Sequence, residues 1–332
     1  MPRKKIARFK FCLGLLLTAG MSLPPVAQAC SRLVYFGGDD QVVTARSMDW
    51  ASDIQTNLWV FPRGMARNGE VGPNSIRWTS RYGSVIAAAY DNSTSDGMNE
   101  AGLVANILWL AESQYPDNSG SKPGLSIAAW AQYVLDNFTT VQAAVDALAK
   151  EPFIIVTAQV PGQDRVANLH LALSDPSGDS AIIEYVNGRQ LIHHSRDYQV
   201  MTNSPTFGRQ LAMEEYWQQI GGTVFLPGTN RAADRFARAS FYVRSIPPVS
   251  DPLQTIATAF SIIRNVSVPI GISTPNQPNI SATRWRTVSD QKRRRTGKVL
   301  KLDLGPNERN IFSGMANKDF KPAKPFQFAG LP

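Results

Sequence analysis

Cysteine is scarce in this chain: only Cys12 and Cys30 occur among 332 residues. Cys12 lies in an amino-terminal segment that we expect to be removed, so the mature chain would hold one cysteine and could form no internal disulfide bond. A chain exported through an oxidising compartment usually has its cysteines paired. A single remaining thiol there favours a chemical role over a structural one.

Histidine is almost as rare, since His170, His193 and His194 are the only three. All three fall in segments with the residue pattern of strands, which favours structural or surface roles. A papain-like catalytic pair would require one of them beside Cys30. The sequence also lacks a cluster of His, Cys, Asp and Glu at metal-ligand spacing, so it predicts neither a metal ion nor another cofactor.

Long apolar runs are missing, apart from one near the amino terminus. There a basic start without acidic residues is followed by the apolar run 11–17, two prolines and the small-residue sequence A-Q-A. This order is typical of a secretory signal, and the run is too short for a comfortable membrane span. We therefore expect a signal peptide over residues 1–29 and a periplasmic or secreted chain over 30–332. An uncleaved anchoring helix is the alternative.

A strong excess of one charge is absent from the expected mature chain. Five of the 34 Lys and Arg residues, and none of the 26 Asp and Glu residues, lie in the expected signal. The remaining 29 basic and 26 acidic residues give a net charge of +3, which offers no case for nucleic-acid binding. The basic run 292–295 predicts a solvated turn between strands. With 43% hydrophobic and 18% charged residues, the composition is that of a folded globular chain.

Strand-like and helix-like segments occur in separate blocks. β-Branched and aromatic residues predict an amino-terminal hairpin over 32–36 and 41–46, and apolar residues at three- and four-residue spacing predict helices further on. Separate blocks favour an α+β layered fold in a single domain over alternating β-α-β units. The other expected strands are 57–62, 84–90, 102–110, 169–174, 181–186, 190–193, 284–289 and 297–302, and the expected helices are 125–135, 140–150, 210–220, 232–245 and 252–266.

A cysteine that becomes the first residue carries both a nucleophile and a base. The thiol has an ordinary pKa of about 8.5 and the α-amine one of about 7.7–8.0, so the amine can accept the thiol proton near neutral pH. Two other interpretations of Cys30 are a buried, inert cysteine and a lipid-attachment site, which would make the chain a non-enzymatic lipoprotein. Ala27 and Gln28 fit a lipoprotein signal poorly, because that signal usually has leucine and a small residue there.

The sequence from Cys30 onward resembles the choloylglycine hydrolase family, which includes penicillin V acylases and bile salt hydrolases. This family belongs to the N-terminal nucleophile hydrolases. The matching segments, in order, are C-S-R at 30–32, R-S-M-D-W at 46–50, D-G-M-N-E-A-G-L at 96–103, T-N-S-P at 202–205, R-F-A-R at 235–238 and W-R-T-V-S-D at 285–290. Together they span nearly the whole expected mature chain.

The resemblance implies a four-layer αββα sandwich, hydrolysis of a linear amide and assembly into a tetramer. Without it, Arg46 and Asp49 would be interpreted as a surface ion pair and Asn203 as a turn residue. The implied site roles are Cys30 as nucleophile and base, Arg46 beside the thiol, Asp49 holding the α-amine, Asn203 donating to the oxyanion, and Arg235 completing the polar shell, with Arg238 as the alternative arginine.

Two tryptophans are expected near the nucleophile. Trp50 directly follows Asp49, and Trp109 stands where bile salt hydrolases usually carry an asparagine; its backbone N–H is a candidate second oxyanion donor. The pair indicates a site for a flat or long apolar acyl group, although core packing would also explain it. The resemblance therefore implies a small amide substrate such as penicillin V or an N-acyl homoserine lactone, with bile salts as the alternative. It implies no lasting membrane anchor.

Overall fold

The computed structural model describes residues 29–117, 122–221, 223–272 and 281–296. All but the last residue of the expected signal 1–29, and the expected strand 297–302, lie outside these ranges. None of the helices within them is long and apolar enough to cross a membrane.

The first sheet has five strands and starts with the predicted hairpin. β1 (Ser31–Phe36) and β2 (Val42–Trp50) pair antiparallel, and all residues of β2 are buried. β2 therefore lies at the centre of the sheet, covered on both faces. The strand order is β14-β1-β2-β15-β16. The added strands are β14 (Val200–Met201), β15 (Ala282–Asp290) and β16 (Arg295–Thr296).

A basic turn joins β15 to β16, as the sequence predicts. Lys292, Arg293 and Arg294 are exposed in it, and Arg293 also pairs with Asp290 at 3.1 Å.

The second sheet has seven antiparallel strands in the order β13-β12-β11-β8-β7-β6-β3. One of them, β7 (Ser93–Asn99), was not expected, because its small polar residues lack a strand signature. These side chains are buried and hydrogen-bonded instead: Thr94 to Gln132, and Ser95 to a backbone carbonyl of β6. The other strands are β3 (Leu58–Phe61), β6 (Ser84–Ala89), β8 (Val104–Trp109), β11 (Leu169–Ser174), β12 (Ser180–Val186) and β13 (Arg189–His194).

The expected helix 125–135 is wrong in its first part. Its opening residues form the short strand β9 (Gly124–Ser126), which pairs in parallel with β10 (Ile154–Val156). The Ser126 side chain then accepts the backbone N–H of Ala128 and caps a 3-10 turn, so α1 (Trp130–Asn137) begins only after it. A small antiparallel hairpin consists of β4 (Ala66–Asn68) and β5 (Arg77–Thr79).

The remaining helices occur where the sequence predicts them. Thr140 caps α2 (Val141–Leu148) by accepting the N–H of Ala143, and Asp251 caps α5 (Pro252–Asn265) in the same way. α4 (Ala232–Ser245) has the predicted ends, whereas α3 (Phe207–Gln219) begins three residues earlier than expected.

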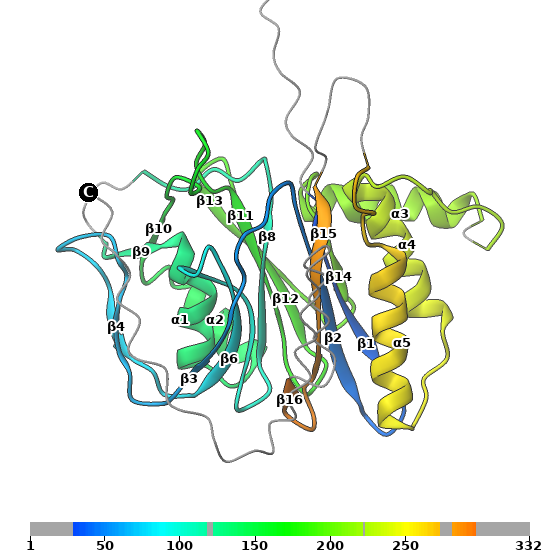
Figure 1. The fold of residues 1–332 in the computed structure, drawn as a ribbon, viewed down its shortest axis with the longest axis horizontal. Helices are drawn as coiled ribbons and strands as arrows, with labels where there is room; N and C mark the ends of the chain where they lie inside the picture. The colour runs from blue at the N-terminus through cyan, green and yellow to red at the C-terminus, as the bar shows by residue number, and fades with distance from the viewer. Residues whose placement is uncertain (1–28, 118–121, 222, 273–280, 297–332) are drawn as a thin grey trace, which may run out of the picture.

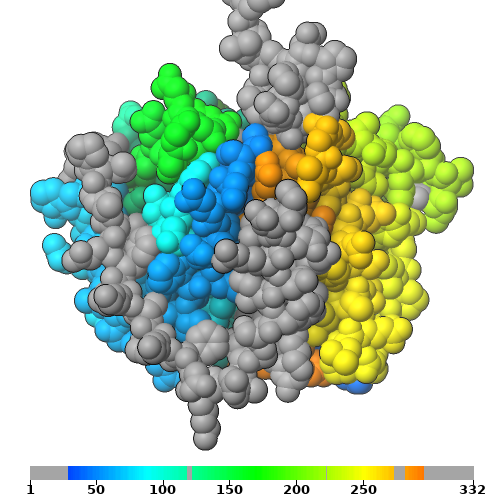
Figure 2. Space-filling model, viewed as in Figure 1, coloured from blue at the N-terminus to red at the C-terminus, as the bar shows by residue number. Residues whose placement is uncertain are grey.

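The elements stack as four layers in an αββα sandwich (Figure 1). α1 and α2 cover the outer face of the seven-stranded sheet, and α4 and α5 cover the outer face of the five-stranded sheet. In Figure 2 the α4–α5 layer, in yellow, forms one side of the molecule, and the region around β3 and β6, in blue and cyan, forms the other. The α+β sandwich predicted from the sequence is confirmed.

Polar side chains are buried between the two sheets, within an otherwise apolar core. The Thr44 and Ser174 hydroxyls lie 2.8 Å apart across the layers, and Nη2 of Arg32 donates to the Leu173 carbonyl at 2.8 Å. Burying such groups costs free energy unless each finds a partner. Buried polar side chains in this layer are therefore candidates for a functional role.

Candidate active site

Cys30 lies at the start of β1, between the sheets, and is only 2% exposed. Its backbone N–H donates to Oδ1 of Asn203 at 2.5 Å. Because Ala29 still precedes it, this nitrogen is a peptide amide, and it stands in for the α-amine that cleavage would release. The thiol Sγ lies 3.8 Å from both Sδ of Met48 and the backbone oxygen of Asp49.

Arg46 places a fully buried cation close to this thiol. Its guanidinium lies 4.6 Å over the Trp285 ring and donates through Nη2 to the Ile107 carbonyl at 3.0 Å. Nε and Nη1 have no hydrogen-bond partner within the described residues. Burial raises the pKa of the Cys30 thiol, and Arg46 is the strongest opposing influence. The net effect of these surroundings is to disfavour the thiolate form of Cys30.

Asp49 is a buried carboxylate held from the neighbouring strand. Thr283, its register partner on β15, donates to Oδ1, and Nη1 of Arg235 lies 4.0 Å from Oδ2. Burial raises the pKa of Asp49 to about 6, with Arg235 the main influence in the other direction. The simple surface ion pair between Arg46 and Asp49 does not form, because both side chains are buried and the ion pair of Asp49 is with Arg235.

Asn203 connects Cys30 to the end of β8. Its Oδ1 accepts from the Cys30 nitrogen and from Nη2 of Arg235 at 2.9 Å, while Nδ2 donates to the Trp109 carbonyl at 2.7 Å. An amide nitrogen carries two hydrogens, so Nδ2 retains one donor for another acceptor. This bond engages the Trp109 carbonyl, and the role of the Trp109 N–H as a second oxyanion donor stays a prediction.

The two candidate arginines on α4 lie in different places. Arg235 is fully buried and donates through Nη1 to the Cys30 carbonyl at 2.6 Å and to Oγ of Ser31 at 2.5 Å. Arg238 donates instead to two backbone carbonyls in the loop before α4. The structure therefore brings Arg235, and not Arg238, together with Cys30.

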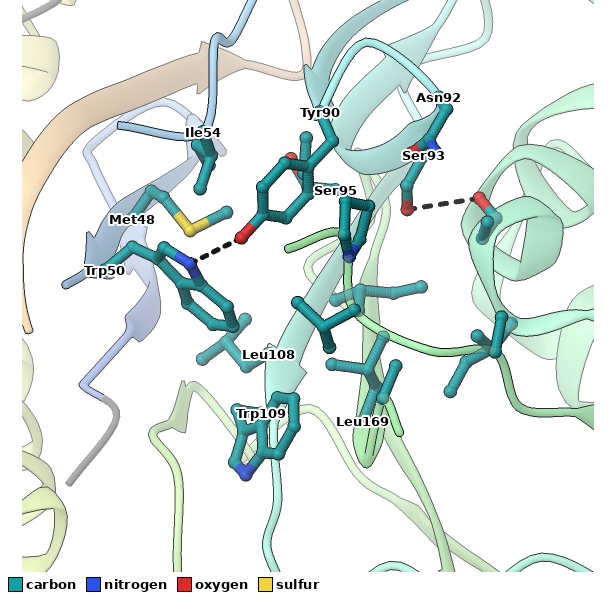
Figure 3. A pocket seen from close by; sticks show the side chains of 18 of the residues that line it. Met48, Trp50, Ile54, Tyr90, Asn92, Ser93, Ser95, Leu108, Trp109 and Leu169 are labelled. Atoms are coloured by element: carbon teal, nitrogen blue, oxygen red, sulfur yellow. Dashed lines mark hydrogen bonds between the residues drawn. The ribbon is translucent and has the colours of Figure 1, made fainter. Parts of the chain in front are cut away.

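An apolar pocket of about 240 Å³ opens beside Cys30 (Figure 3). Trp50 and Trp109 meet edge to face at its wall, with ring centroids 6.0 Å apart, and Nε1 of Trp50 donates to the Tyr90 hydroxyl at 2.7 Å. Figure 3 shows both indoles facing the same space from different strands. Other apolar lining residues include Met48, Ile54, Leu108, Val160 and Leu169.

Sequence reasoning missed several residues of this site. Thr283 reaches Asp49 through strand register, and Tyr90 reaches Trp50 from the end of β6, so no local motif signals either contact. Arg165 lies with its guanidinium carbon 4.7 Å from the Trp109 ring, a cation–π arrangement supplied by a loop. Of the groups in these contacts with the pocket, only the two tryptophans, Trp50 and Trp109, were predicted from the sequence.

The histidines do not form a pair with Cys30. The ring nitrogens of His170 face Glu184 and a backbone carbonyl. His193 lies 3.5 Å from Glu184, and His194 pairs with Asp179, which directly precedes β12. No group of three or more His, Cys, Asp or Glu side chains in the described part of the chain is placed to hold a metal ion.

Comparisons with known proteins agree with this geometry. The family described as linear amide C–N hydrolases, choloylglycine hydrolase family, matches residues 30–297, beginning at Cys30. A penicillin V acylase from Pectobacterium atrosepticum is 55% identical over 351 aligned positions, which cover 92% of this chain and 93% of that protein. A conjugated bile acid hydrolase from Lactobacillus gasseri is 25% identical, over 72% of this chain and 82% of its own length.

Solved structures show the same fold. The structure of penicillin V acylase from Agrobacterium tumefaciens superimposes with a TM-score of 0.80 at 61% identity, over 91% of this chain and all of that one. A mutant of conjugated bile acid hydrolase from Clostridium perfringens gives a TM-score of 0.67 at 21% identity, over 79% and 86% of the two chains. The chain thus belongs to the choloylglycine hydrolase family and is a hydrolase of linear amide C–N bonds.

Proposed function

We propose that this protein is exported, begins at Cys30 after cleavage, and uses the Cys30 thiol to hydrolyse small amides with an apolar acyl group. Its substrates are penicillin V, N-acyl homoserine lactones, or both. One observation carries the proposal: the only thiol of the expected mature chain lies at an apolar pocket, on a backbone whose nitrogen and carbonyl contact Asn203 and Arg235. The family match that begins at Cys30 supports cleavage at that point.

The proposed reaction has two steps. The free α-amine accepts the thiol proton while sulfur attacks the acyl carbon, and the second hydrogen on Nδ2 of Asn203 stabilises the oxyanion. The ammonium group then returns the proton to the leaving nitrogen as the C–N bond breaks. Water attacks the resulting thioester, the amine accepts a proton from it, and the carboxylic acid and the Cys30 thiol are released.

The pocket favours a flat or linear acyl group over a steroid. The contacting indoles of Trp50 and Trp109 form an aromatic part of its wall, and the rest of the wall is mostly aliphatic. An aryl ring or a methylene chain can lie against such surfaces. The bile acid hydrolase relative is much more distant in sequence than the penicillin V acylase, which also favours the acylase substrates.

A substrate panel tests the proposal. The purified mature protein should release the acyl group from penicillin V or decanoyl homoserine lactone faster than from glycocholate, and Cys30→Ala should abolish turnover while leaving the fold intact. Full activity in the alanine variant would contradict the proposed nucleophile. Preference for glycocholate would favour the bile salt alternative.

The mass of the exported protein tests processing. A chain that starts at an unmodified Cys30 supports the enzyme, whereas added acyl chains on that residue would support the lipoprotein interpretation, since acylation consumes the amine. We expect the mature chain in the periplasm or medium as a tetramer, which sedimentation can measure.

A further inference from the structure

The segment that presents Asn203 is anchored by buried polar groups of the opposite sheet. It follows β14 in the five-stranded sheet, yet its Thr202 carbonyl accepts from Nε2 of His170 on β11 at 2.8 Å. Thr202 is fully buried, and so is His170, with 1% exposure. Water therefore cannot replace this hydrogen bond if it is lost.

His170 has a hydrogen-bond acceptor on each side. Nδ1 lies 3.1 Å from Oε1 of Glu184, and Nε2 faces the Thr202 carbonyl. A carbonyl oxygen can only accept, so Nε2 must carry a hydrogen for this bond to exist. The carboxylate at Nδ1 fixes the plane of the ring, which aims Nε2 at Thr202.

Glu184 holds both the ring and the helix that follows. Its two oxygens accept the Phe207 backbone N–H at the start of α3, at 3.0 and 3.1 Å, and His193 lies 3.5 Å from one of them. Burial alone would raise the pKa of Glu184, but the hydrogen bond from His170 and the nearby His193 ring hold it at about 2. The Glu184 carboxylate thus holds the segment between β14 and α3 at both ends: through His170 at Thr202, and directly at the Phe207 N–H.

We propose that His170 is a positioning residue for the reaction: by holding the Thr202 carbonyl, it fixes the peptide that carries Asn203. This inference rests on the proposed function of Asn203 as the oxyanion donor. Gln210 holds the other side of the same segment, donating to the Asn203 and Pro205 carbonyls. Loss of the His170 bond frees one end, and the amide of Asn203 moves relative to the Cys30 nitrogen that it contacts.

Two substitutions separate positioning from general stability. In His170→Gln the side-chain NH₂ reaches the Nε2 position and keeps a donor for Thr202. In His170→Asn the NH₂ reaches only the Nδ1 position and leaves the carbonyl unpaired. Each loses one buried hydrogen bond, so both should lower the melting temperature by a similar amount. His194→Gln is the matched control, because His194 pairs with Asp179 and has no contact with Thr202.

The measurement is kcat and KM on penicillin V or decanoyl homoserine lactone, whichever the wild type turns over faster. We expect His170→Asn to lower kcat roughly 10- to 100-fold with KM within about twofold, because a misplaced oxyanion donor is felt mainly in the transition state. His170→Gln should keep kcat within about threefold. Nitrogen-15 NMR of the wild-type protein should show a hydrogen-bonded Nε2–H for His170. The same signal should persist in His194→Gln.

Three results would overturn the inference. A wild-type kcat in His170→Asn, or equal loss in the Asn and Gln variants, would show that His170 serves stability alone. An Nε2 without hydrogen in the wild-type spectrum would remove the bond itself. A wild-type protein that hydrolyses neither penicillin V, decanoyl homoserine lactone nor glycocholate would instead contradict the proposed function, and the positioning role that rests on it.

Discussion

The carbonyl oxygen of Cys30 accepts a hydrogen bond from Nη1 of Arg235 at 2.6 Å. The same guanidinium reaches Asn203 and lies 4.0 Å from the Asp49 carboxylate, so one cation joins three groups of the candidate site. We predict that Arg235→Ala lowers kcat/KM by at least about 100-fold. It should also destabilise the protein by about 3–5 kcal/mol, because the buried Asp49 carboxylate loses its cation.

Arg238→Ala is the matched control for that variant. Its side chain is half-buried and donates to two loop carbonyls away from Cys30, so turnover should stay within about twofold of wild type. Urea unfolding and steady-state kinetics of the two variants provide the comparison. Equal losses in both would mean that Arg235 has no special relation to Cys30.

Ionisation of the buried Asp49 carboxyl lowers the free energy of unfolding as the pH rises. Its pKa is raised from 3.8 to about 6, so the folded state keeps the Asp49 proton to a higher pH than the unfolded state does. Stability is therefore lost as the pH rises from about 4 to about 6, by roughly 3 kcal/mol in total. Asp49→Asn should remove this loss, so the variant gains stability relative to wild type across that window.

Unfolding by urea at a series of pH values measures the effect. The free α-ammonium of the processed chain should lower the pKa of Asp49, so the gain is smaller after cleavage than before it. A stability difference that stays constant from about pH 4 to about pH 7 would contradict the prediction. Turnover should fall in the variant even where stability rises, because the proposed role of Asp49 is to hold the amine.

The sequence predicts elements well where side-chain pattern decides structure. The hairpin that begins at Arg32 follows from β-branched and aromatic residues, and the helix 232–245 follows from apolar spacing. It fails at β7, whose Thr94 and Ser95 are polar but find partners only after α1 and β6 have packed beside them. Tertiary context, not local preference, makes that segment a strand.

The candidate site shows the same division. Cys30, Arg46 and Asp49 were identifiable because a family pattern and a cleavage signal mark them along the chain. Thr283 was not, because its contact with Asp49 arises from the pairing of strands more than 200 residues apart in sequence. Long-range register of this kind leaves no trace in a local motif.

The two indoles should control acyl-group recognition. Trp109→Ala removes one wall of the pocket, so we expect KM for penicillin V to rise roughly tenfold with kcat changed less, since ring contacts are present before and during reaction. Tyr90→Phe leaves the Trp50 N–H without its acceptor and should raise KM about threefold. Tyr216→Ala, an exposed aromatic on α3, is the control. A kcat effect without a KM effect would place Trp109 in the chemistry instead.

The buried thiol makes Cys30 slow to react in the absence of substrate. Because burial raises the pKa of the thiol, iodoacetamide should label Cys30 slowly at neutral pH and faster as the pH rises. Arg46→Gln removes the strongest opposing influence, so labelling at neutral pH should slow further. Intact mass follows the single modified site, and a bound acyl substrate should protect it. Rapid labelling at neutral pH that does not depend on Arg46 would show that the thiol is already ionised by another group, and the α-amine would then have no proton to accept.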